Sequence, residues 1–517
     1  MTTEPSLHGE TTWVTKIGFW LGLVLFLLIF VIPGGEDHEG IPPAARKVAA
    51  VTLLCAIWWI TQPIPIPATS LIPLVLFPIL GVSSAGDTAK AYAHDLIMLL
   101  MGGFFISQAI QKCGLHRRIA LRVIASAGRQ PAMIVFGFML ATALLSMWIS
   151  NTATCLMLLP IALAIISQVS KANPDDPAGS AALGTALMLG IAYAANVGGI
   201  GTPIGTPPNV LFLAHFSEAF PNAPPITFPQ WMAYTIPLVA LFIPIIWFLL
   251  VRVLCPIPKG LSTGKGDLIE EEIRKLGPMT VPERRVLCLF AVTAFLWIFR
   301  ADIQIGEEGL RIPGIVTWLH RLGLPERITE ARFVGDGTVA IFMAIIFFLV
   351  PTQRGSQDRL LDWKSASKIP WGLLLLFGGG LAIAHGFDES GLSEWFGEKL
   401  TILGDKPTIV MIGADCLLLT FMTEITSNTA VTSVMMPILA KLSNSIDVNP
   451  ILLMMPAAIS ASFAFMLPVG TGPNAVVYSS GLVPIGRMAR AGVILNIIGV
   501  ILVTGYIYLV MVVIKGM

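Results

Sequence analysis

The tripeptide Ser-Asn-Thr occurs twice in this chain, at residues 150–152 and 427–429, each time in the middle of strongly apolar sequence. The two copies are 277 residues apart, and the same shift superposes flanking glycines and a following proline without a gap. A second pair of polar segments, rich in glycine and proline, follows the tripeptides at residues 205–209 and 470–474. The chain therefore contains an internal repeat, and each half interrupts apolar sequence at two corresponding places.

The composition indicates a membrane protein. Of the 517 residues, 55% are hydrophobic and only 12% are charged, whereas soluble domains carry about 25% charged residues. Apolar runs such as 231–254 and 491–513 are long enough to cross a bilayer. The net charge of +1 provides no basic field for a nucleic-acid partner, so membrane lipid is the expected environment. Six scattered cysteines without a CxxC pair are expected to be small apolar packing residues.

Two segments, 131–167 and 407–440, are too long for one membrane crossing of about 20 residues and carry Ser-Asn-Thr near their centres. We expect both to be re-entrant hairpins that return to the side from which they enter. The glycine- and proline-rich segments interrupt two further spans, 183–214 and 450–482, which we expect to be broken helices. The pattern predicts an all-α polytopic membrane protein with about 11 transmembrane helices in an inverted-repeat arrangement.

This topology divides the chain into four parts. Residues 1–44 form an N-terminal tail and first span, 45–254 the first inverted repeat, 255–285 a cytoplasmic linker and 286–517 the second inverted repeat. With the N-terminus in the cytoplasm, Lys and Arg are more frequent in the inside segments than in the outside segments, as the positive-inside rule requires. The basic amphipathic segment 116–124 is expected to lie flat on the inner surface.

The polar interruptions are neutral. No charged side chain lies between Pro131 and Ser170 or between Ile451 and Ile485. Carbonyl, hydroxyl and Asn amide oxygens suit a hard monovalent cation, whereas free N–H groups at helix ends suit an anion. The Asn of each tripeptide can offer its oxygen to a cation or its NH₂ group to a carboxylate. Alternatively, Ser and Thr bond to carbonyls of kinked helices and Asn joins helices, but two copies in inverted register favour a binding site.

At these residues the chain resembles the divalent anion:sodium symporter family. The resemblance rests on the two Ser-Asn-Thr tips and on the segment 461–477, and it covers essentially the whole chain after the N-terminal tail. It implies two sodium sites, each between a hairpin tip and the following break, and a shared substrate site. By position, the first sodium site would use Ser146, Ser150, Asn151 and Gly199, the second Thr423, Thr426, Asn428 and Gly470, and the substrate site Asn151, Thr152, Asn428 and Thr429, with Thr206 and Thr471 nearby.

The same resemblance implies a function. It predicts a secondary active transporter of a bacterial inner membrane that couples sodium entry to uptake of a small dianion. The leading substrate is a C4-dicarboxylate such as succinate, malate or fumarate, carried with at least two Na⁺ and without an organic cofactor. The resemblance further implies a homodimer with an elevator mechanism, in which a scaffold domain holds the dimer contact while the hairpins and broken spans slide as a transport domain.

Several alternatives stay open. Within the class they are sulfate or tricarboxylate (citrate) symport with sodium, and sodium-independent dicarboxylate exchange. An intramembrane enzyme is disfavoured because the sequence has no His-Glu-x-x-His or Gly-x-Ser-x-Gly motif. A channel is disfavoured because inverted broken helices that meet at mid-bilayer suit a closed, alternating site better than an open pore.

One intramembrane acid, Glu424, lies three residues before the second tripeptide, and Met147 takes its place in the first repeat. It is either a proton or cation site or a buried carboxyl that accepts hydrogen bonds from the hairpin backbone, and the second interpretation is favoured.

Overall fold

The described part of the chain is mainly helical. The computed structural model describes residues 13–31, 41–258, 260–262, 268–304, 311–321, 334–392, 395 and 406–514. Within these residues the only strands are a two-residue antiparallel pair, β1 (Ile303–Gln304) and β2 (Arg311–Ile312). Nine helices of the described chain are long and apolar enough to cross a membrane, and shorter apolar helices accompany them. The predicted all-α polytopic fold is confirmed, while most of the N-terminal tail lies outside the described residues.

The helices form two compact units, each assembled from segments far apart in the sequence. The first contains Met1–His94, Pro370–Asp405 and Ser433–Val448, and the second contains Asp95–Ile369, Lys406–Thr432 and Asn449–Met517. Each unit thus takes residues from both predicted repeats. All of the residues predicted from the sequence to bind ions or substrate belong to the second unit.

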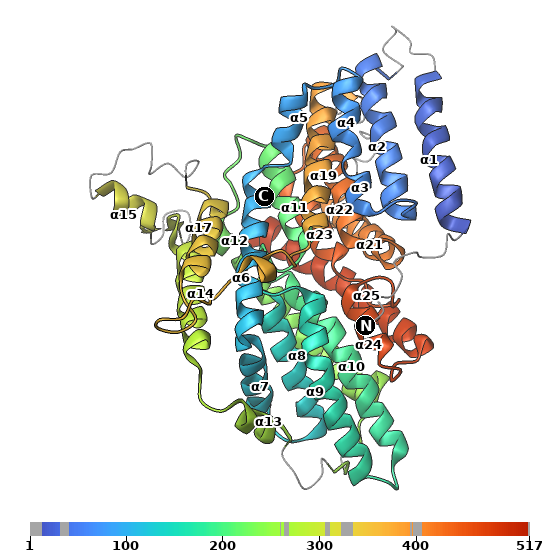
Figure 1. The fold of residues 1–517 in the computed structure, drawn as a ribbon. Helices are drawn as coiled ribbons and strands as arrows, with labels where there is room; N and C mark the ends of the chain where they lie inside the picture. The colour runs from blue at the N-terminus through green and yellow to red at the C-terminus, as the bar shows by residue number, and fades with distance from the viewer. Residues whose placement is uncertain are drawn as a thin grey trace, which may run out of the picture. The chain divides into compact units, whose positions relative to one another are not determined.

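In the first unit, one helix of the second repeat packs against helices of the first repeat. Helix α19 (Trp371–Glu389) contacts α2 (Pro43–Thr61), α3 (Ile66–Thr69), α4 (Ile72–Ile79) and α5 (Ala85–Ala91), and α1 (Trp13–Val31) lies along α2 (Figure 1). The contact is close because Gly379 lies directly against the backbone of Ser70, where a side chain would collide. The Ser70 carbonyl accepts a hydrogen bond of 2.6 Å from the Tyr92 hydroxyl.

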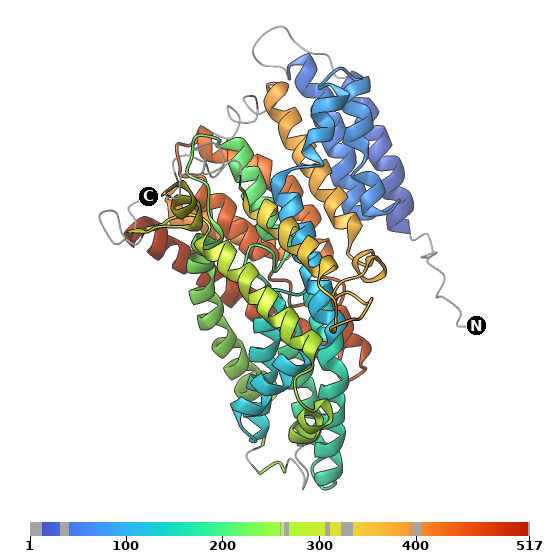
Figure 2. The same cartoon turned by 60° about the vertical axis from the view of Figure 1, so that its left-hand side comes forward.

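The second unit holds the first predicted hairpin, the second predicted hairpin as far as Thr432, and both predicted broken helices (Figures 1 and 2). The first hairpin is α8 (Pro131–Ser146) and α9 (Asn151–Ala172), and its broken helix is α10 (Pro177–Gly199) and α11 (Pro207–Ala219). The second hairpin is α21 (Thr408–Ile425) and α22 (Asn428–Ser445), whose later residues belong to the first unit, and its broken helix is α23 (Ile451–Ala461) and α24 (Gly472–Ser479). The remaining elements are α6 (Asp95–Cys113), α7 (Leu115–Ala127), α12 (Phe228–Leu249) with the π-helical turn η1 (Leu250–Leu254), α13 (Leu268–Leu276), α14 (Val281–Phe299), α15 (Ile315–Arg321), α17 (Asp336–Leu349), α18 (Trp363–Ala366), and α25 (Ile485–Ile507) with η3 (Tyr508–Ile514).

The helix boundaries at the interruptions follow from local chemistry. Helix α11 begins at Pro207, and α24 has Pro473 in its first turn, where a missing N–H costs nothing. Helix α8 has 16 residues and is therefore about 24 Å long, shorter than a hydrocarbon core of about 30 Å. Helices α9 and α21, with 22 and 18 residues, are instead among the nine described helices long enough to cross, so the re-entrant course of the hairpins stays a prediction.

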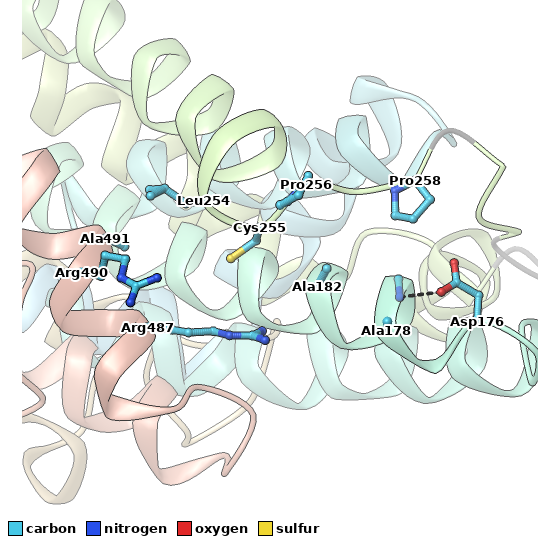
Figure 3. A pocket seen from close by; sticks show the side chains of 11 residues that line it. Asp176, Ala178, Ala182, Leu254, Cys255, Pro256, Pro258, Arg487, Arg490 and Ala491 are labelled. Carbon is cyan, nitrogen blue, oxygen red and sulfur yellow. Dashed lines mark hydrogen bonds between the residues drawn. The ribbon is translucent and has the colours of Figure 1, made fainter.

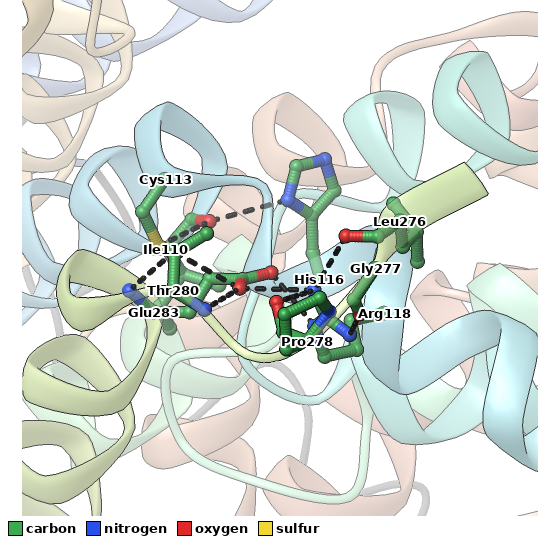
Figure 4. A network of polar contacts seen from close by, with 9 residues as sticks. All are labelled: Ile110, Cys113, His116, Arg118, Leu276, Gly277, Pro278, Thr280 and Glu283. Atoms are coloured by element: carbon green, nitrogen blue, oxygen red, sulfur yellow. Dashed lines mark hydrogen bonds and ion pairs between the residues drawn. The ribbon is translucent and has the colours of Figure 1, made fainter. Parts of the chain in front are cut away.

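Helix α7 is amphipathic, as expected, but one of its basic residues is buried. Arg118 donates from Nε to Glu283 at 2.8 Å and from Nη1 to the Gly277 carbonyl at 2.9 Å. Glu283 also caps α14, since one of its oxygens accepts from Thr280 N at 2.7 Å. Figure 4 shows Arg118 enclosed by the turn that contains Pro278 and by the start of α14. The segment 116–124 is therefore fixed to the linker through Arg118, and not every basic residue in it faces outward.

This network makes a prediction about stability. Glu283→Gln is expected to lower the free energy of unfolding by about 3 kcal/mol, because the buried guanidinium of Arg118 loses its counter-charge. Burial raises the pKa of Glu283, but hydrogen bonds from Arg118 and Thr280 outweigh burial and hold the pKa below its ordinary value of 4.5. A carboxyl with a lowered pKa stabilises the fold above that ordinary value, and this contribution disappears as the pH falls through the folded-state pKa.

Thermal unfolding of the wild type and of Glu283→Gln, measured across a pH series, checks the expected loss of stability. The matched control is Glu272→Gln, which removes a partly exposed carboxylate paired with Arg117 at 2.5 Å and is expected to cost at most about 1 kcal/mol. A stability difference between wild type and Glu283→Gln that stayed constant down to strongly acidic pH would contradict the proposed ion pair.

Candidate functional site

The predicted site residues lie where helices end and begin. In the first repeat α8 ends at Ser146 and α10 at Gly199, whereas α9 begins at Asn151 and α11 at Pro207. The second repeat has the same pattern, with ends at Ile425 and Ala461 and beginnings at Asn428 and Gly472. Helix C-termini present free carbonyls and partial negative charge, which suit a cation, and helix N-termini present free N–H groups, which suit an anion. Each repeat therefore offers backbone groups for both kinds of ion.

Four predicted residues of the first repeat lie together. Ser146 Oγ is 2.5 Å from Asn151 Oδ1 and 2.8 Å from the Ala195 carbonyl oxygen. A methyl group on Gly199 would lie 2.9 Å from Asn151 Oδ1 and 3.2 Å from Thr206 Cβ, so glycine is required for this close approach. Ser146, Asn151, Gly199 and Thr206 thus form one cluster of neutral oxygen-bearing groups, which we call the first cluster.

Two asparagines close the breaks in the same way. Asn209 Nδ2 donates to the carbonyls of Gly199 at 3.1 Å and Thr202 at 2.7 Å. Asn474 Nδ2 donates to Ala464 at 2.9 Å and Leu467 at 3.0 Å. Shifting the first set by 265 residues gives the second, so the repeat detected in the sequence also holds for individual hydrogen bonds. The sequence showed both asparagines as part of the breaks but assigned them no role.

The predicted residues of the second repeat are arranged differently. Thr423 Oγ1 bonds to the Thr420 carbonyl at 3.0 Å and Thr426 Oγ1 to the Met422 carbonyl at 2.9 Å, both within α21. Asn428 Oδ1 is buried and has no hydrogen-bond partner in the described part of the chain. A methyl group on Gly470 would lie 3.2 Å from Glu424 Oε2. An acceptor oxygen of Asn428 thus remains open to a cation, and a carboxyl group lies beside Gly470.

Glu424 holds the second break together. One carboxyl oxygen accepts from Phe465 N at 2.7 Å and Met466 N at 2.9 Å, and the other accepts from Leu467 N at 3.0 Å. Asn496 on α25 adds a fourth bond of 2.7 Å. The side chain is a buried hydrogen-bonded carboxyl, as the favoured interpretation expected. The expected partners were wrong, because the N–H groups belong to the broken helix and not to the hairpin.

The two repeats meet at their breaks. Helix α24 packs against α9 and α10, and α11 packs against α23. Gly472 lies directly against the Thr152 side chain, and Asn196 Nδ2 donates to Thr471 Oγ1 at 3.1 Å. Thr152 and Thr471 are thus brought to the contact between repeats. Ser150 is exposed and Thr429 is buried, and within the described residues no side-chain hydrogen bond joins either to another predicted site residue.

The donor set is neutral oxygen. Among the residues that the structure describes, no group of three or more His, Cys, Asp or Glu side chains is placed to hold a metal ion. Hydroxyl, amide and carbonyl oxygens at helix ends fit hard cations that bind weakly and leave again, which a carried ion must do.

Two helical hairpins and two broken helices, one of each in either half of an all-helical integral membrane protein, are typical of a transporter. Residues 14–514 match the family described as the sodium:sulfate symporter transmembrane region, and the chain belongs to this family. The resemblance to divalent anion:sodium symporters is thereby confirmed.

Similar proteins agree with this assignment. The sodium-dependent dicarboxylate transporter SdcS of Staphylococcus saprophyticus is 37% identical over 95% of this chain and 90% of its own length. SdcS of Staphylococcus aureus is 38% identical over 97% of this chain and 92% of its own length. The solved structure of MtrF from Neisseria gonorrhoeae, described among antimetabolite efflux pumps, matches with a TM-score of 0.59 over 95% of this chain and 94% of MtrF. At 13% identity this last likeness shows the fold alone.

Proposed function

We propose that this protein couples the entry of sodium ions to the uptake of a divalent anion, in particular a C4-dicarboxylate such as succinate, malate or fumarate. The observation that carries the proposal is the duplicated arrangement of helix ends around a tip asparagine, which provides cation-binding carbonyls and anion-binding N–H groups side by side. Family membership and the names of relatives at 37% and 38% identity support the same function. The protein acts as a carrier, without catalysis and without an organic cofactor.

Two sodium ions occupy the two tip-and-break regions in this proposal. The first uses Ser146, Ser150, Asn151 and Gly199, of which three form most of the first cluster. The second uses Thr423, Thr426, Asn428 and Gly470, and the open Oδ1 of Asn428 supports a cation there. The dianion lies between the repeats, against Asn151, Thr152, Asn428 and Thr429 with Thr206 and Thr471 nearby.

The charge balance explains why sodium is needed. No basic side chain occurs between Pro131 and Ser170 or between Ile451 and Ile485 to offset a dianion. Two Na⁺ neutralise one dianion, which makes its passage through the membrane feasible. A third Na⁺ would make each cycle electrogenic and let the membrane potential contribute about 2.3 kcal/mol per charge per 100 mV.

Sulfate is the second candidate, because the family description names it. Uptake of labelled succinate, citrate and sulfate into proteoliposomes, each with Na⁺ or K⁺ outside, separates the candidates. We expect succinate to accumulate only with Na⁺ and with a sigmoidal dependence on its concentration. Accumulation that was equally fast in K⁺ would overturn the coupling, and preference for citrate or sulfate would overturn the substrate.

The orientation in the membrane makes a separate prediction. We propose that the N-terminus is cytoplasmic in a bacterial inner membrane, that the repeats are inverted, and that two copies form an elevator-type dimer. The first hairpin then enters and leaves on the cytoplasmic side, so single cysteines in place of Gln130 and Gln168 should react with an impermeant maleimide from the same side. Labelling of these two positions from opposite sides of the membrane would show that the segment spans it.

A further inference from the structure

A cavity of about 390 Å³ lies in the second unit where three segments of the chain meet (Figure 3). Its lining comes from the start of α10, from residues 254–258 after α12, and from the first turns of α25. Two arginines of α25, Arg487 and Arg490, line one side. They are three residues apart and so lie on the same face of the helix. The cavity is thus of ligand size and positively charged on one side.

Neither arginine is neutralised by its surroundings. Arg487 and Arg490 are exposed, and their guanidinium groups have no ion-pair or hydrogen-bond partner within the described ranges. The one acid of the cavity, Asp176, instead caps α10 by accepting from Gly179 N at 2.8 Å. Figure 3 shows Asp176 beside Pro258, at the end of the cavity away from Arg490. Guanidinium groups offer five N–H donors each in a planar fork that matches phosphate oxygens.

An apolar groove lies along two of the elements next to this cavity, helices α12 and α25. A second cavity of about 390 Å³ is lined only by apolar residues, six of them from α12 and Ile498 from α25. Helices α12 and α25 pack against each other. Leu249 in this groove precedes Leu254 of the arginine cavity by five residues, about 8 Å along a helix, and Ile498 follows Arg490 by eight residues, about 12 Å. The apolar groove is therefore reached from the charged cavity by going back along α12 or forward along α25.

We propose that the two cavities together bind one anionic phospholipid, with its phosphate on Arg487 and Arg490 and an acyl chain in the groove lined by α12 and Ile498. In the proposed orientation the arginines lie on the cytoplasmic side, where the leaflet is rich in anionic lipid and basic pockets between helices recognise lipid headgroups. The apolar groove favours a lipid over a free phosphate ion as the ligand, because a phosphate ion has no apolar part that could occupy the groove.

Titration of the purified full-length protein in detergent, followed by native mass spectrometry, tests the proposal. The probes are dioleoyl phosphatidylglycerol, dioleoyl phosphatidylcholine and inorganic phosphate. The double variant R487Q/R490Q should bind phosphatidylglycerol at least tenfold more weakly than wild type. The matched control R122Q/R354Q removes two other exposed arginines and should change this affinity less than twofold.

The apolar groove is tested independently by Ala240→Phe, which fills it from an exposed position on α12. This variant should bind phosphatidylglycerol at least threefold more weakly than wild type. If both arginine double variants lost the same affinity for phosphatidylglycerol, the proposed site would be wrong, since the general positive charge of the surface would explain both losses. If the wild type bound phosphatidylcholine as tightly as phosphatidylglycerol, the proposed role of the arginines would be wrong. If it bound inorganic phosphate as tightly as phosphatidylglycerol, or if Ala240→Phe kept the wild-type affinity for phosphatidylglycerol, the ligand would not be a lipid held in the groove. Retained thermal unfolding temperatures exclude misfolding as the cause of any loss.

Discussion

Asn151→Asp and Asn428→Asp are each expected to weaken dianion binding by a factor of at least roughly a hundred while sodium binding persists. Aspartate keeps an oxygen for Na⁺ but removes the amide donor and places a negative charge against the substrate. At an effective dielectric constant of about 20 and a separation of about 4 Å, this repulsion costs on the order of 4 kcal/mol before screening, and about 1.4 kcal/mol is a factor of ten in affinity.

The measurement is succinate binding and sodium binding to purified variants, each determined without the other ligand and then together. Asn449→Asp is the matched control, because it adds the same charge while its Oδ1 keeps its bond to Ile451 N, 3.0 Å long in the wild type, at the start of α23. Near-normal succinate affinity in both tip variants would mean that the tips do not share the substrate, and the site assignment would have to be abandoned.

Glu424→Gln should be nearly as damaging. With its oxygen in the place of Oε1, glutamine keeps the bonds from Phe465 N, Met466 N and Asn496 as neutral ones and turns its NH₂ group toward Leu467 N, which then has no acceptor. Hydrogen bonds to a charged acceptor contribute about 1.5–3 kcal/mol each and ordinary ones about 0.5–1.5 kcal/mol, so losing the Leu467 bond and weakening the other three costs about 3 kcal/mol or more. Because Glu424 Oε2 lies next to Gly470, the distorted break should also weaken the second sodium site.

The role of Glu424 is separated from general instability by the sodium dependence of transport, measured well below the unfolding temperature of the variant. We expect the concentration of Na⁺ for half-maximal uptake to rise at least tenfold in Glu424→Gln and to recover partly in Glu424→Asp. Glu270→Gln, a partly exposed carboxylate paired with Arg129 at 2.5 Å, is the control and should transport normally. An unchanged sodium dependence of transport in Glu424→Gln would mean that Glu424 contributes to packing only and not to sodium binding.

Local sequence signals predicted much of this fold. The hairpin 131–167 and the broken span 450–482 agree with the observed helices α8–α9 and α23–α24 to within a few residues. These segments were predictable because prolines and glycines interrupt helices by their own local chemistry, and because the polar Ser-Asn-Thr tripeptides interrupt otherwise apolar sequence. The 265-residue shift even predicted which positions correspond, although not the hydrogen bonds that Asn209 and Asn474 make there.

Contacts between residues far apart along the chain could not be predicted from the sequence. Arg118 bonds to Glu283, 165 residues away, and a basic residue in an amphipathic segment gives no sign that it will be buried. Glu424 was recognised as a buried acid, but its donors lie 41 to 72 residues away along the chain. Hydrogen-bond partners of this kind depend on how helices pack, and helical periodicity does not carry that information.

The carboxyl group of Glu424 has no counterpart in the first repeat, where Met147 stands and offers only its backbone carbonyl, to Thr202. The two repeats are therefore not interchangeable at this position. The Glu424 carboxyl accepts hydrogen bonds from three consecutive N–H groups of the second break and a fourth from Asn496 of α25, so the backbone there is already ordered when an ion arrives. The first break is held instead through its carbonyl and hydroxyl groups, by Trp231 Nε1 bonded to the Ile200 carbonyl and Thr202 Oγ1 bonded to the Met147 carbonyl, and we expect the two halves of the carrier to bind their cations with different affinities.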